Sequence, residues 1–334
     1  MPLSSPLIQH TALYQTHMTT SSSSLSLLSS GNARPRRARE RRGWLRLLPA
    51  YLLMLPTVVL VALFWWYPLL NVVYASLYQW DGIGPLQHFV GLANYRALLF
   101  EDAYFWNAVK NTLAWTAMYA TLPVGIGLLA ALMLNARIRG ENFFKGVIYL
   151  PSAISFAVVA FIWGWMYHPA GGLINQLVRA IGLDFLAQPW LASNVLVLPA
   201  INVASSWVHA GFALVVFLAG LRGIPDELVE AATIDGANQW QVIRRILIPL
   251  LRPAFTVVFG WTLMLSVNVF DQINILTKGG PGRASEVLSI YLYVKTFLEH
   301  QAGVASAIGV IMFLLAAIGG VAYVRQMIAQ EVTY

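Results

Sequence analysis

Long apolar stretches separated by shorter polar segments dominate the chain from residue 48 to residue 324. A transmembrane helix needs about 20 predominantly apolar residues to cross a hydrocarbon core ~30 Å thick. Six stretches reach this length, although polar residues between Asn202 and His209 interrupt the fourth. The predicted spans are residues 48–70, 111–134, 146–167, 194–221, 253–276 and 303–324. The pattern therefore predicts an all-α, polytopic membrane protein with six transmembrane helices.

The composition supports burial in lipid. Hydrophobic residues make up 58% of the 334 residues and charged residues only 10%, whereas roughly 25% of a soluble domain is charged. Cysteine is absent, which excludes disulfides and thiolate metal sites. The net charge of +7 suggests a nucleic-acid partner as a rival interpretation, but the apolar bulk argues against it.

The N-terminal residues differ from the rest. Residues 1–46 contain a Ser-rich run at Thr19–Ser30 and a basic block at Arg34–Arg42, and both patterns predict a disordered tail. The apolar stretch that follows is longer than the 7–15 residues of a signal peptide's hydrophobic region and lacks a small-x-small cleavage site. We therefore expect an uncleaved first span, and the sequence leaves open whether Met1 or Met18 is the start.

The distribution of Lys and Arg predicts the orientation, because cytoplasmic loops carry an excess of these residues. With the N-terminus inside, 15 of the 21 basic residues fall on the inner side. The six on the outer side are Arg96, Lys110, Arg179, Lys278, Arg283 and Lys295. Both termini, the loop 222–252 and the tail 326–334 are therefore predicted to be cytoplasmic.

The loop 222–252 predicts two short helices joined at a glycine. Pro225 suits a first helical turn, where its missing N–H costs nothing. Gly236 suits the end of that helix, and Asn238 can begin a second helix with an apolar stripe that includes Trp240. A helix–Gly–helix unit fits a docking element, but a connector lying on the membrane has the same periodicity.

A motif within this loop separates the two interpretations. Residues Glu230-Ala-Ala-x-x-Asp-Gly-Ala237, followed by Pro249 and Pro253, resemble the EAA loop of ABC-importer permeases, and Asp-Gly-Ala is typical of the sugar-importer version. Further segments similar to these permeases are Phe89–Tyr95, Phe105–Thr112, Tyr149–Pro151, Gly172–Asn175 and Leu276–Pro281. The resemblance covers about residues 48–325, so that the permease domain would be residues 47–325.

The resemblance implies the fold and partners of a type I ABC-importer permease. The chain would be the first permease of an ATP-driven, binding-protein-dependent importer of a di- or oligosaccharide, in a bacterial or archaeal cytoplasmic (inner) membrane. Two ATPase subunits, a second homologous permease and an extracytoplasmic sugar-binding protein would complete it. ATP and Mg would bind to the ATPase, with no cofactor or metal in this chain. The implied ATPase-coupling residues are Glu230, Ala231, Ala232, Asp235, Gly236, Ala237 and Pro249.

Polar residues within the predicted spans indicate a candidate substrate path. Polar groups inside a bilayer are costly unless they face partners or water. The candidates are Ser205, His209, Thr262, Ser266 and Asn268, which the resemblance favours because sugar-importer permeases line their path with the corresponding stretches. The alternative is that these side chains form hydrogen bonds between neighbouring helices, as Ser, Thr and Asn commonly do in membrane proteins. Asp271, the only carboxylate within a predicted span, could pair with Lys278 near the outer surface rather than meet the substrate.

Other functions find less support. The chain has no Gly-x-x-x-x-Gly-Lys-Ser/Thr phosphate loop and no metal-spaced pair of histidines, so we expect a transport subunit rather than an enzyme. An ion-coupled secondary transporter would need a relay of buried carboxylates. A permease for glycerol phosphate or another polyol is the nearer alternative. The sequence does not name the sugar.

Overall fold

The computed structural model describes residues 37–136 and 139–331. The predicted disordered run Thr19–Ser30 and the two candidate starts, Met1 and Met18, lie outside these residues. The chain divides into two compact units, Met1–Val61 and Ala62–Tyr334.

The described part of the first unit is the helix α1, Arg37–Val61. Residues 37–46 of the predicted disordered tail are therefore helical, because Arg, Ala, Glu and Leu all favour a helix and the single Gly43 among them does not end it. From residue 49 on, the apolar side chains of α1 are exposed, with Leu53 81% exposed. A helix that is hydrophobic all round is typical of a membrane span.

The second unit begins by continuing this span and then forms a small hairpin. The π-turn η1, Ala62–Trp66, leads into α2, Tyr67–Ala75. The strands β1, Tyr78–Gln79, and β2, His88–Phe89, are antiparallel, with Tyr78 paired to Phe89 and Gln79 to His88. The short elements α3, Ala93–Arg96, and η2, Ala97–Glu101, follow.

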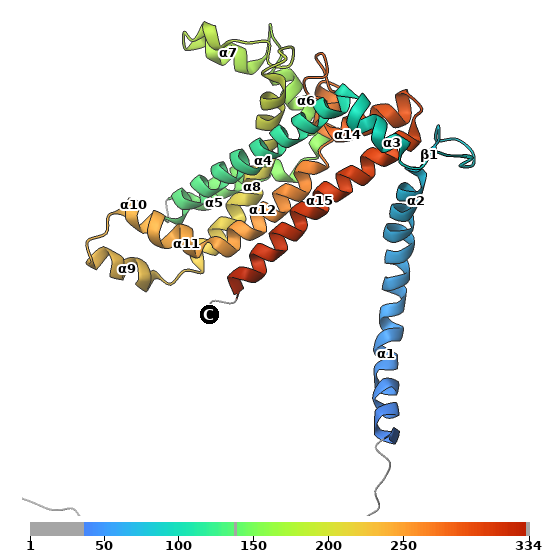
Figure 1. Cartoon of the computed structure of the whole chain (residues 1–334). Helices are drawn as coiled ribbons and strands as arrows, with labels where there is room; N and C mark the ends of the chain where they lie inside the picture. Colours follow the sequence, from blue (N-terminus) through green and yellow to red (C-terminus); the bar gives the residue numbers. More distant parts are fainter. Residues whose placement is uncertain (1–36, 137–138, 332–334) are drawn as a thin grey trace, which may run out of the picture. The chain divides into compact units, whose positions relative to one another are not determined.

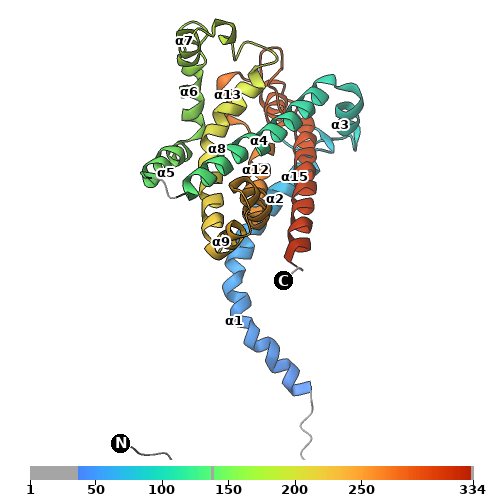
Figure 2. The same ribbon diagram turned by 90° about the vertical axis from the view of Figure 1, so that its left-hand side faces the viewer.

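Four long helices form the body of the second unit, and they run side by side in Figures 1 and 2. They are α4, Ala103–Asn135; α8, Val197–Arg222; α12, Arg252–Val267; and α15, Ala302–Glu331. α12 packs against α4, α8 and α15, and α4 packs along α8. Residues 326–331 of the predicted C-terminal tail are thus part of α15.

Shorter elements connect these helices. Between α4 and α8 lie α5, Glu141–Tyr149; η3, Leu150–Ala153; α6, Phe156–Met166; α7, Leu173–Ala180; and η4, Asp184–Leu186. Between α8 and α12 lie α9, Asp226–Ile234; α10, Gln239–Val242; η5, Ile243–Leu247; and α11, Ile248–Leu250. Between α12 and α15 lie α13, Asp271–Leu276; α14, Leu288–Tyr293; and η6, Val294–Leu298.

Four helices of the described residues are long and apolar enough to cross a membrane: Pro49–Ala75, Ala103–Asn135, Val197–Arg222 and Ala302–Arg325. Two bent helix pairs raise the number to six if each pair is one span. Glu141–Ala153 and Phe156–Met166 meet at 105°, and Gln239–Leu250 and Arg252–Val267 meet at 65°. The described helices thus allow four to six spans.

Two of the predicted spans are interrupted in the structure. Within 146–167, Ser155 is extended and its hydroxyl accepts a hydrogen bond from the Val158 N–H at 3.4 Å, so a new helix begins after the break. Within 253–276, α12 ends at Val267, and Phe270 has the non-helical φ of −139°. Side chains that cap or bond the backbone locally favour such breaks.

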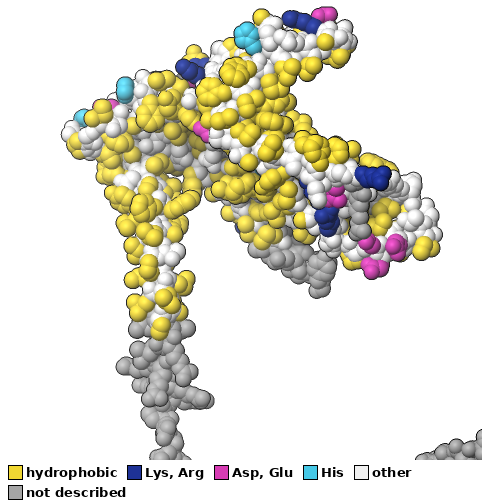
Figure 3. All heavy atoms as spheres, turned by 180° about the vertical axis from the view of Figure 1, so that it is seen from behind, with side chains coloured by type: hydrophobic (Ala, Val, Ile, Leu, Met, Phe, Trp, Pro, Cys, Tyr) yellow, Lys and Arg dark blue, Asp and Glu magenta, His cyan; other side chains and the backbone are white. Residues whose placement is uncertain are grey.

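The surface of the described chain is mostly apolar. Figure 3 shows hydrophobic side chains covering the sides of the helices, whereas charged side chains gather towards the ends of the second unit. A core of buried side chains from α4, α8 and α12 lies inside, for example Ala131, Leu214 and Val258. This distribution is the one expected of a helical bundle with lipid around it.

Candidate functional site

The predicted coupling loop, residues 222–252, folds as two short helical segments joined at Gly236. The first helix, α9, ends in a Schellman motif: the Ala237 N–H donates to the Ala232 carbonyl at 2.9 Å, and the Gly236 N–H to the Thr233 carbonyl at 3.1 Å. Gly236 has a φ of +84°, and a Cβ built on it would meet nothing within 4 Å. The glycine is therefore needed for its backbone conformation and not for space.

The second helical segment begins at the residue that the sequence predicts. Asn238 forms a capping box with Gln241: its side chain accepts from the Gln241 N–H at 2.9 Å, and its own N–H donates to the Gln241 side chain at 2.8 Å. α10, η5 and α11 then lead to Arg252. Two local capping arrangements therefore hold the bend of the coupling loop in one shape.

The coupling loop has a buried side and an exposed side. Val242, Leu247 and Leu251 are buried in the same core as the ends of α4 and α8. By contrast, Ile234 is 85% exposed and Trp240 is 66% exposed. Large exposed apolar side chains next to polar ones are typical of a protein interaction site.

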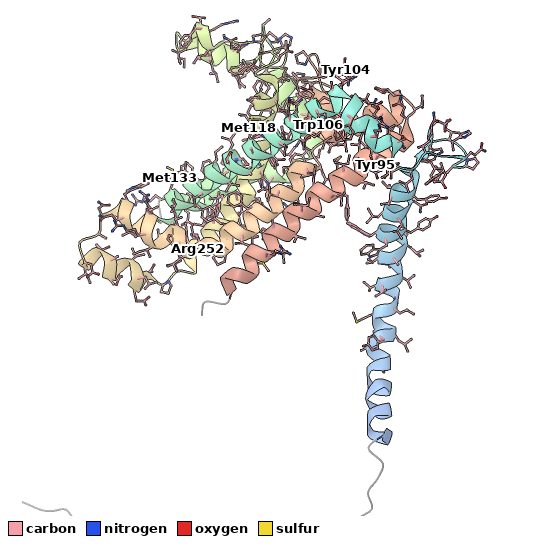
Figure 4. All side chains as sticks on the ribbon, viewed as in Figure 1. Tyr95, Tyr104, Trp106, Met118, Met133 and Arg252 are labelled. Atoms are coloured by element: carbon pink, nitrogen blue, oxygen red, sulfur yellow. The ribbon has the colours of Figure 1, made fainter. Side chains whose placement is uncertain are left out.

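The implied ATPase-coupling residues all lie on this loop. Glu230, Ala231, Asp235 and Gly236 are exposed, and Ala232, Ala237 and Pro249 are half-buried. The four exposed residues are clustered around the end of α9. In Figure 4, Met133 of α4 and Arg252 lie towards this end of the second unit, and Tyr104 and Trp106 lie at the other.

Ion pairs join the base of the coupling loop to a neighbouring helix. Glu141, the first residue of α5, pairs with both Arg222, the last residue of α8, and Lys145. The Glu141 side chain is 18% exposed and that of Arg222 is 49% exposed. This cluster is not predictable from the sequence, because residues 141 and 222 are brought together only by the packing of α5 against α8.

The polar residues of the predicted substrate path fall into two groups. His209 and Thr262 are buried and face each other, with His209 Nε2 and Thr262 Oγ1 2.7 Å apart, so they link α8 to α12. Ser266 is also buried and donates to the Leu263 carbonyl of its own helix at 2.9 Å. Ser205 and Asn268 instead line a common pocket.

This pocket, here called the Trp115 pocket, has a volume of about 300 Å³. Its walls combine aromatic and polar side chains, which are Trp115, Tyr119, Phe156, Ser205, Leu265, Asn268, Val269, Phe270, Asp271 and Gln272. Aromatic walls with a few polar groups are typical of small-molecule sites, whose volumes run from about 300 to 1,000 Å³. The pocket lies between α4, α6, α8 and the break that follows α12.

Two groups of the Trp115 pocket have no hydrogen-bond partner among the described residues. The Trp115 indole N–H is buried and unpaired. The Asp271 side chain is exposed and has neither an ion pair nor a hydrogen bond within the described chain, so the alternative pairing with Lys278 is not observed. A buried donor without a partner is costly unless water or a ligand satisfies it.

Trp115 and Tyr119 are not among the site residues predicted from the sequence. Their rings stack 5.7 Å apart, and the Tyr119 ring stacks on the His209 ring at 5.1 Å. The spacing of four residues along one apolar span is a weak signal, because aromatic residues at helical spacing are common in any span. Only the packing of α4 on α8 shows that these two rings border a pocket.

The end of the second unit opposite the coupling loop carries a second polar cluster. The Asn107 and Asn111 side chains of α4 donate to the Arg283 carbonyl at 2.9 and 3.2 Å, and Arg283 pairs with Glu286 at 3.2 Å. Burial raises the pKa of the Glu286 carboxyl, and the Arg283 guanidinium partly offsets this. Among the described residues, no group of three or more His, Asp or Glu could hold a metal ion.

The family described as "binding-protein-dependent transport system inner membrane component" matches residues 123–329. The chain belongs to this family. The matched residues include the whole coupling loop and most of the lining of the Trp115 pocket, but not Trp115 and Tyr119. The permease is therefore a multi-pass component of the inner membrane and a transport subunit rather than an enzyme.

Two curated relatives align with most of the permease. The "probable starch degradation products transport system permease protein" AmyD of Thermoanaerobacterium thermosulfurigenes is 33% identical over 276 residues, 82% of this chain and 90% of that protein. The sn-glycerol-3-phosphate transport system permease protein UgpA of Agrobacterium fabrum is 32% identical over 271 residues, 81% of this chain and 91% of that protein.

Solved structures have the same fold. A chain of a bacterial ABC transporter involved in the import of the acidic polysaccharide alginate superimposes with a TM-score of 0.75 and 25% identity, covering 89% of this permease and 100% of that chain. A structure of a bacterial alginate ABC transporter, in complex with a periplasmic protein that holds an alginate pentasaccharide, has a TM-score of 0.72 and 26% identity, covering 84% and 94%. The described helices thus have the arrangement of an ABC-importer permease.

Proposed function

We propose that this permease imports a di- or oligosaccharide by alternating access, driven by a separate ATPase that docks on the coupling loop. The single observation that carries the proposal is the two-sided construction of this loop. One side is buried in the core of the transmembrane helices, and the other presents Glu230, Ile234 and Trp240 to the solvent. A force applied to the exposed side would therefore reach α4, α8 and α12 directly.

The proposed assembly contains two ATPase subunits, a second homologous permease and an extracytoplasmic saccharide-binding protein. The family description supports the binding protein. The alginate transporter, which has the same fold, is found with a periplasmic protein that holds a pentasaccharide. ATP and Mg would bind to the ATPase, and the N-terminus, the coupling loop and the C-terminus would face the cytoplasm, as the excess of Lys and Arg on that side favours.

The Trp115 pocket is the proposed contact with the substrate. Ser205 and Asn268 line it and offer hydroxyl and amide groups to a saccharide. His209, Thr262 and Ser266 are assigned to the wall of the same path, where His209 and Thr262 hold α8 and α12 together. Aromatic faces suit the C–H side of a sugar ring, and amides and hydroxyls suit its hydroxyl groups.

A glycerol phosphate is the second candidate substrate, because UgpA is similar to this permease over most of its length. The described lining of the Trp115 pocket contains no Lys or Arg to bind a phosphate, which favours the saccharide. An ion-coupled mechanism finds less support, because Asp271 is the only carboxylate in that lining.

The coupling loop provides the test of this function. Glu230→Lys reverses a charge at the proposed docking surface, and Gly236→Pro imposes a φ near −65° where the structure has +84°. In the transporter purified with its ATPase, we expect both variants to insert into the membrane. We expect each to lower ATPase co-purification and ATP-dependent saccharide uptake into proteoliposomes by at least about tenfold.

Matched variants serve as controls. Gly236→Asn keeps a residue that tolerates positive φ and is expected to retain uptake within about threefold of the wild type. Glu101→Lys reverses a charge on a side chain that is 64% exposed, far from the coupling loop in the chain. Normal ATPase co-purification and uptake in both Glu230→Lys and Gly236→Pro would show that the coupling loop is not the docking site.

A further inference from the structure

The described lining of the Trp115 pocket contains an acidic side chain and no basic one. Asp271 is the only ionisable acid or base among its described lining, apart from the phenol of Tyr119, and no Lys, Arg or His lines it. The Asp271 carboxylate has no counter-ion among the described residues, since none of their ion pairs includes it. A ligand in this pocket therefore meets an uncompensated negative charge.

A position at the first turn of α13 does not fully explain this residue. An acidic side chain there interacts favourably with the helix dipole. However, this interaction leaves the carboxylate oxygens exposed and unpaired beside the pocket, where they remain available to hydrogen-bond donors. Trp115, which lines the same pocket, has a buried indole N–H without a partner among the described residues.

These groups match the hydroxyls of an uncharged sugar. A carboxylate has two oxygens that accept hydrogen bonds from neighbouring hydroxyl groups, and an indole N–H donates to a hydroxyl or ring oxygen. Asn268 and Gln272 add amides that both donate and accept. A uronate or a phosphate ester would instead bring a second negative charge close to Asp271, with no Lys or Arg in the lining to neutralise it.

We propose that Asp271 makes the Trp115 pocket selective for uncharged saccharides over saccharides that carry a carboxylate or phosphate. This inference rests on the proposed saccharide path. It separates the permease from two proteins that it resembles in sequence or fold: a transporter for the acidic polysaccharide alginate and a permease for glycerol 3-phosphate. Similar folds with opposite charge preferences are expected where the preference depends on a few pocket side chains.

The test uses disaccharide pairs that differ only by a carboxylate: cellobiose with cellobiouronic acid, and maltose with its uronic acid counterpart. Binding to the assembled transporter in nanodiscs is followed by saturation-transfer-difference NMR, without the binding protein, so that the binding protein's own selectivity does not contribute. For the wild type we expect each uronate to bind about tenfold more weakly than its neutral partner, because like charges repel at short range.

Asp271→Asn is expected to remove this difference. It should strengthen uronate binding about tenfold, and the neutral sugars should stay within about threefold because the amide still forms hydrogen bonds. If Asp271→Asn assembles poorly, Asp271→Ser provides a second measurement of the neutral-to-uronate ratio without the carboxylate. Asp184→Asn, which neutralises an exposed carboxylate in the segment between α7 and α8, is the matched control and should leave the ratio unchanged.

Trp115→Phe tests whether saccharides bind in this pocket, independently of the charge preference. It removes the unpaired N–H together with the five-membered ring of the indole, and it should weaken all bound sugars about fivefold without changing the neutral-to-uronate ratio. Equal binding of neutral and uronate sugars to the wild type, or an unchanged ratio in Asp271→Asn, would overturn the charge inference alone. No binding of any sugar, or no effect of Trp115→Phe on any of them, would overturn the saccharide path and the inference with it.

Discussion

At the residue scale, buried polar side chains join the helices of this permease. His209 and Thr262 are buried, with 4% and 0% of their surface exposed. His209 Nε2 on α8 lies 2.7 Å from Thr262 Oγ1 on α12. Thr262 also donates to the Val258 carbonyl of its own helix at 2.6 Å, so its hydroxyl accepts from His209. This arrangement assigns the N–H of the imidazole to Nε2 and orients the ring against Tyr119.

We predict that Thr262→Val destabilises the permease by about 0.6–2 kcal/mol, because the substitution keeps the shape of the side chain but leaves the His209 N–H without its acceptor. Thermal unfolding of the purified permease in detergent measures the change. Thr121→Val is the control, since the exposed Thr121 hydroxyl bonds only to carbonyls of its own helix. Equal stability of the Thr262 variant and the wild type would mean that this bond contributes little.

Local interactions explain why some residues could be predicted from the sequence. Gly236 ends α9 and Asn238 starts α10, as their residue types and spacing indicate, because each acts on backbone groups within five residues. The same reasoning could not find Trp115 or Asp271 as pocket residues. Their neighbours come from α6 and α8, and no local pattern reports which helices are adjacent.

At the element scale, α4 and α8 approach each other through small residues. A Cβ built on Gly127 of α4 would lie 2.5 Å from the Ala213 Cβ and 2.8 Å from the Leu214 backbone N. Small residues at helix interfaces let backbones come close, which strengthens packing inside a membrane. The contact matters beyond stability, because α4 and α8 both supply walls of the Trp115 pocket.

We predict that Gly127→Ala destabilises the permease by about 1–3 kcal/mol, because backbone atoms of α8 would have to shift to admit the added methyl group. Thermal unfolding again measures the loss, and saccharide binding should weaken with it. Gly125→Ala is a close control, because a Cβ at Gly125 would meet nothing within 4 Å. If both variants were equally stable, α4 and α8 would not be packed as closely as the structure has them.

The interrupted spans also belong to this scale. Hydropathy predicts where apolar residues accumulate, but it does not register a break of two or three residues. Ser155 caps the start of a new helix, and residues 268–270 follow the end of another, within apolar stretches that hydropathy alone treats as continuous. The second of these breaks supplies Asn268 and Phe270 to the Trp115 pocket.

At the scale of the whole molecule, α8 connects the two proposed functional regions of the permease, the Trp115 pocket and the coupling loop. Its middle carries Ser205 at the Trp115 pocket, and its last residue, Arg222, leads into the coupling loop. The ion pairs of Glu141 with Arg222 and Lys145 also tie this end of α8 to α5, which continues through η3 towards α6. Movement of the coupling loop is therefore expected to act on α8 and α5 together.

We predict that Glu141→Gln lowers the saccharide imported per ATP hydrolysed by about two- to fivefold. It should change the stability of the permease little, because the Arg222 side chain is 49% exposed and solvent screens the pair. Parallel measurements of uptake and ATP hydrolysis in proteoliposomes give the ratio. Glu101→Gln, which removes a 3.7 Å pair with Arg96 elsewhere in the chain, should leave it unchanged. An unchanged ratio in Glu141→Gln would mean that these ion pairs do not transmit the movement.

The sequence by itself determined that this protein is a helical membrane permease, which apolar stretches lie in its helices, and which loop carries the motif proposed for coupling. These features depend on hydropathy and on contacts between near neighbours along the chain, which the order of residues specifies directly. Only the tertiary structure decided that Trp115 and Asp271 share a pocket, that His209 meets Thr262, and that Glu141 pairs with Arg222. Each of these contacts joins residues more than 50 positions apart, and the packing of whole helices is what brings them together.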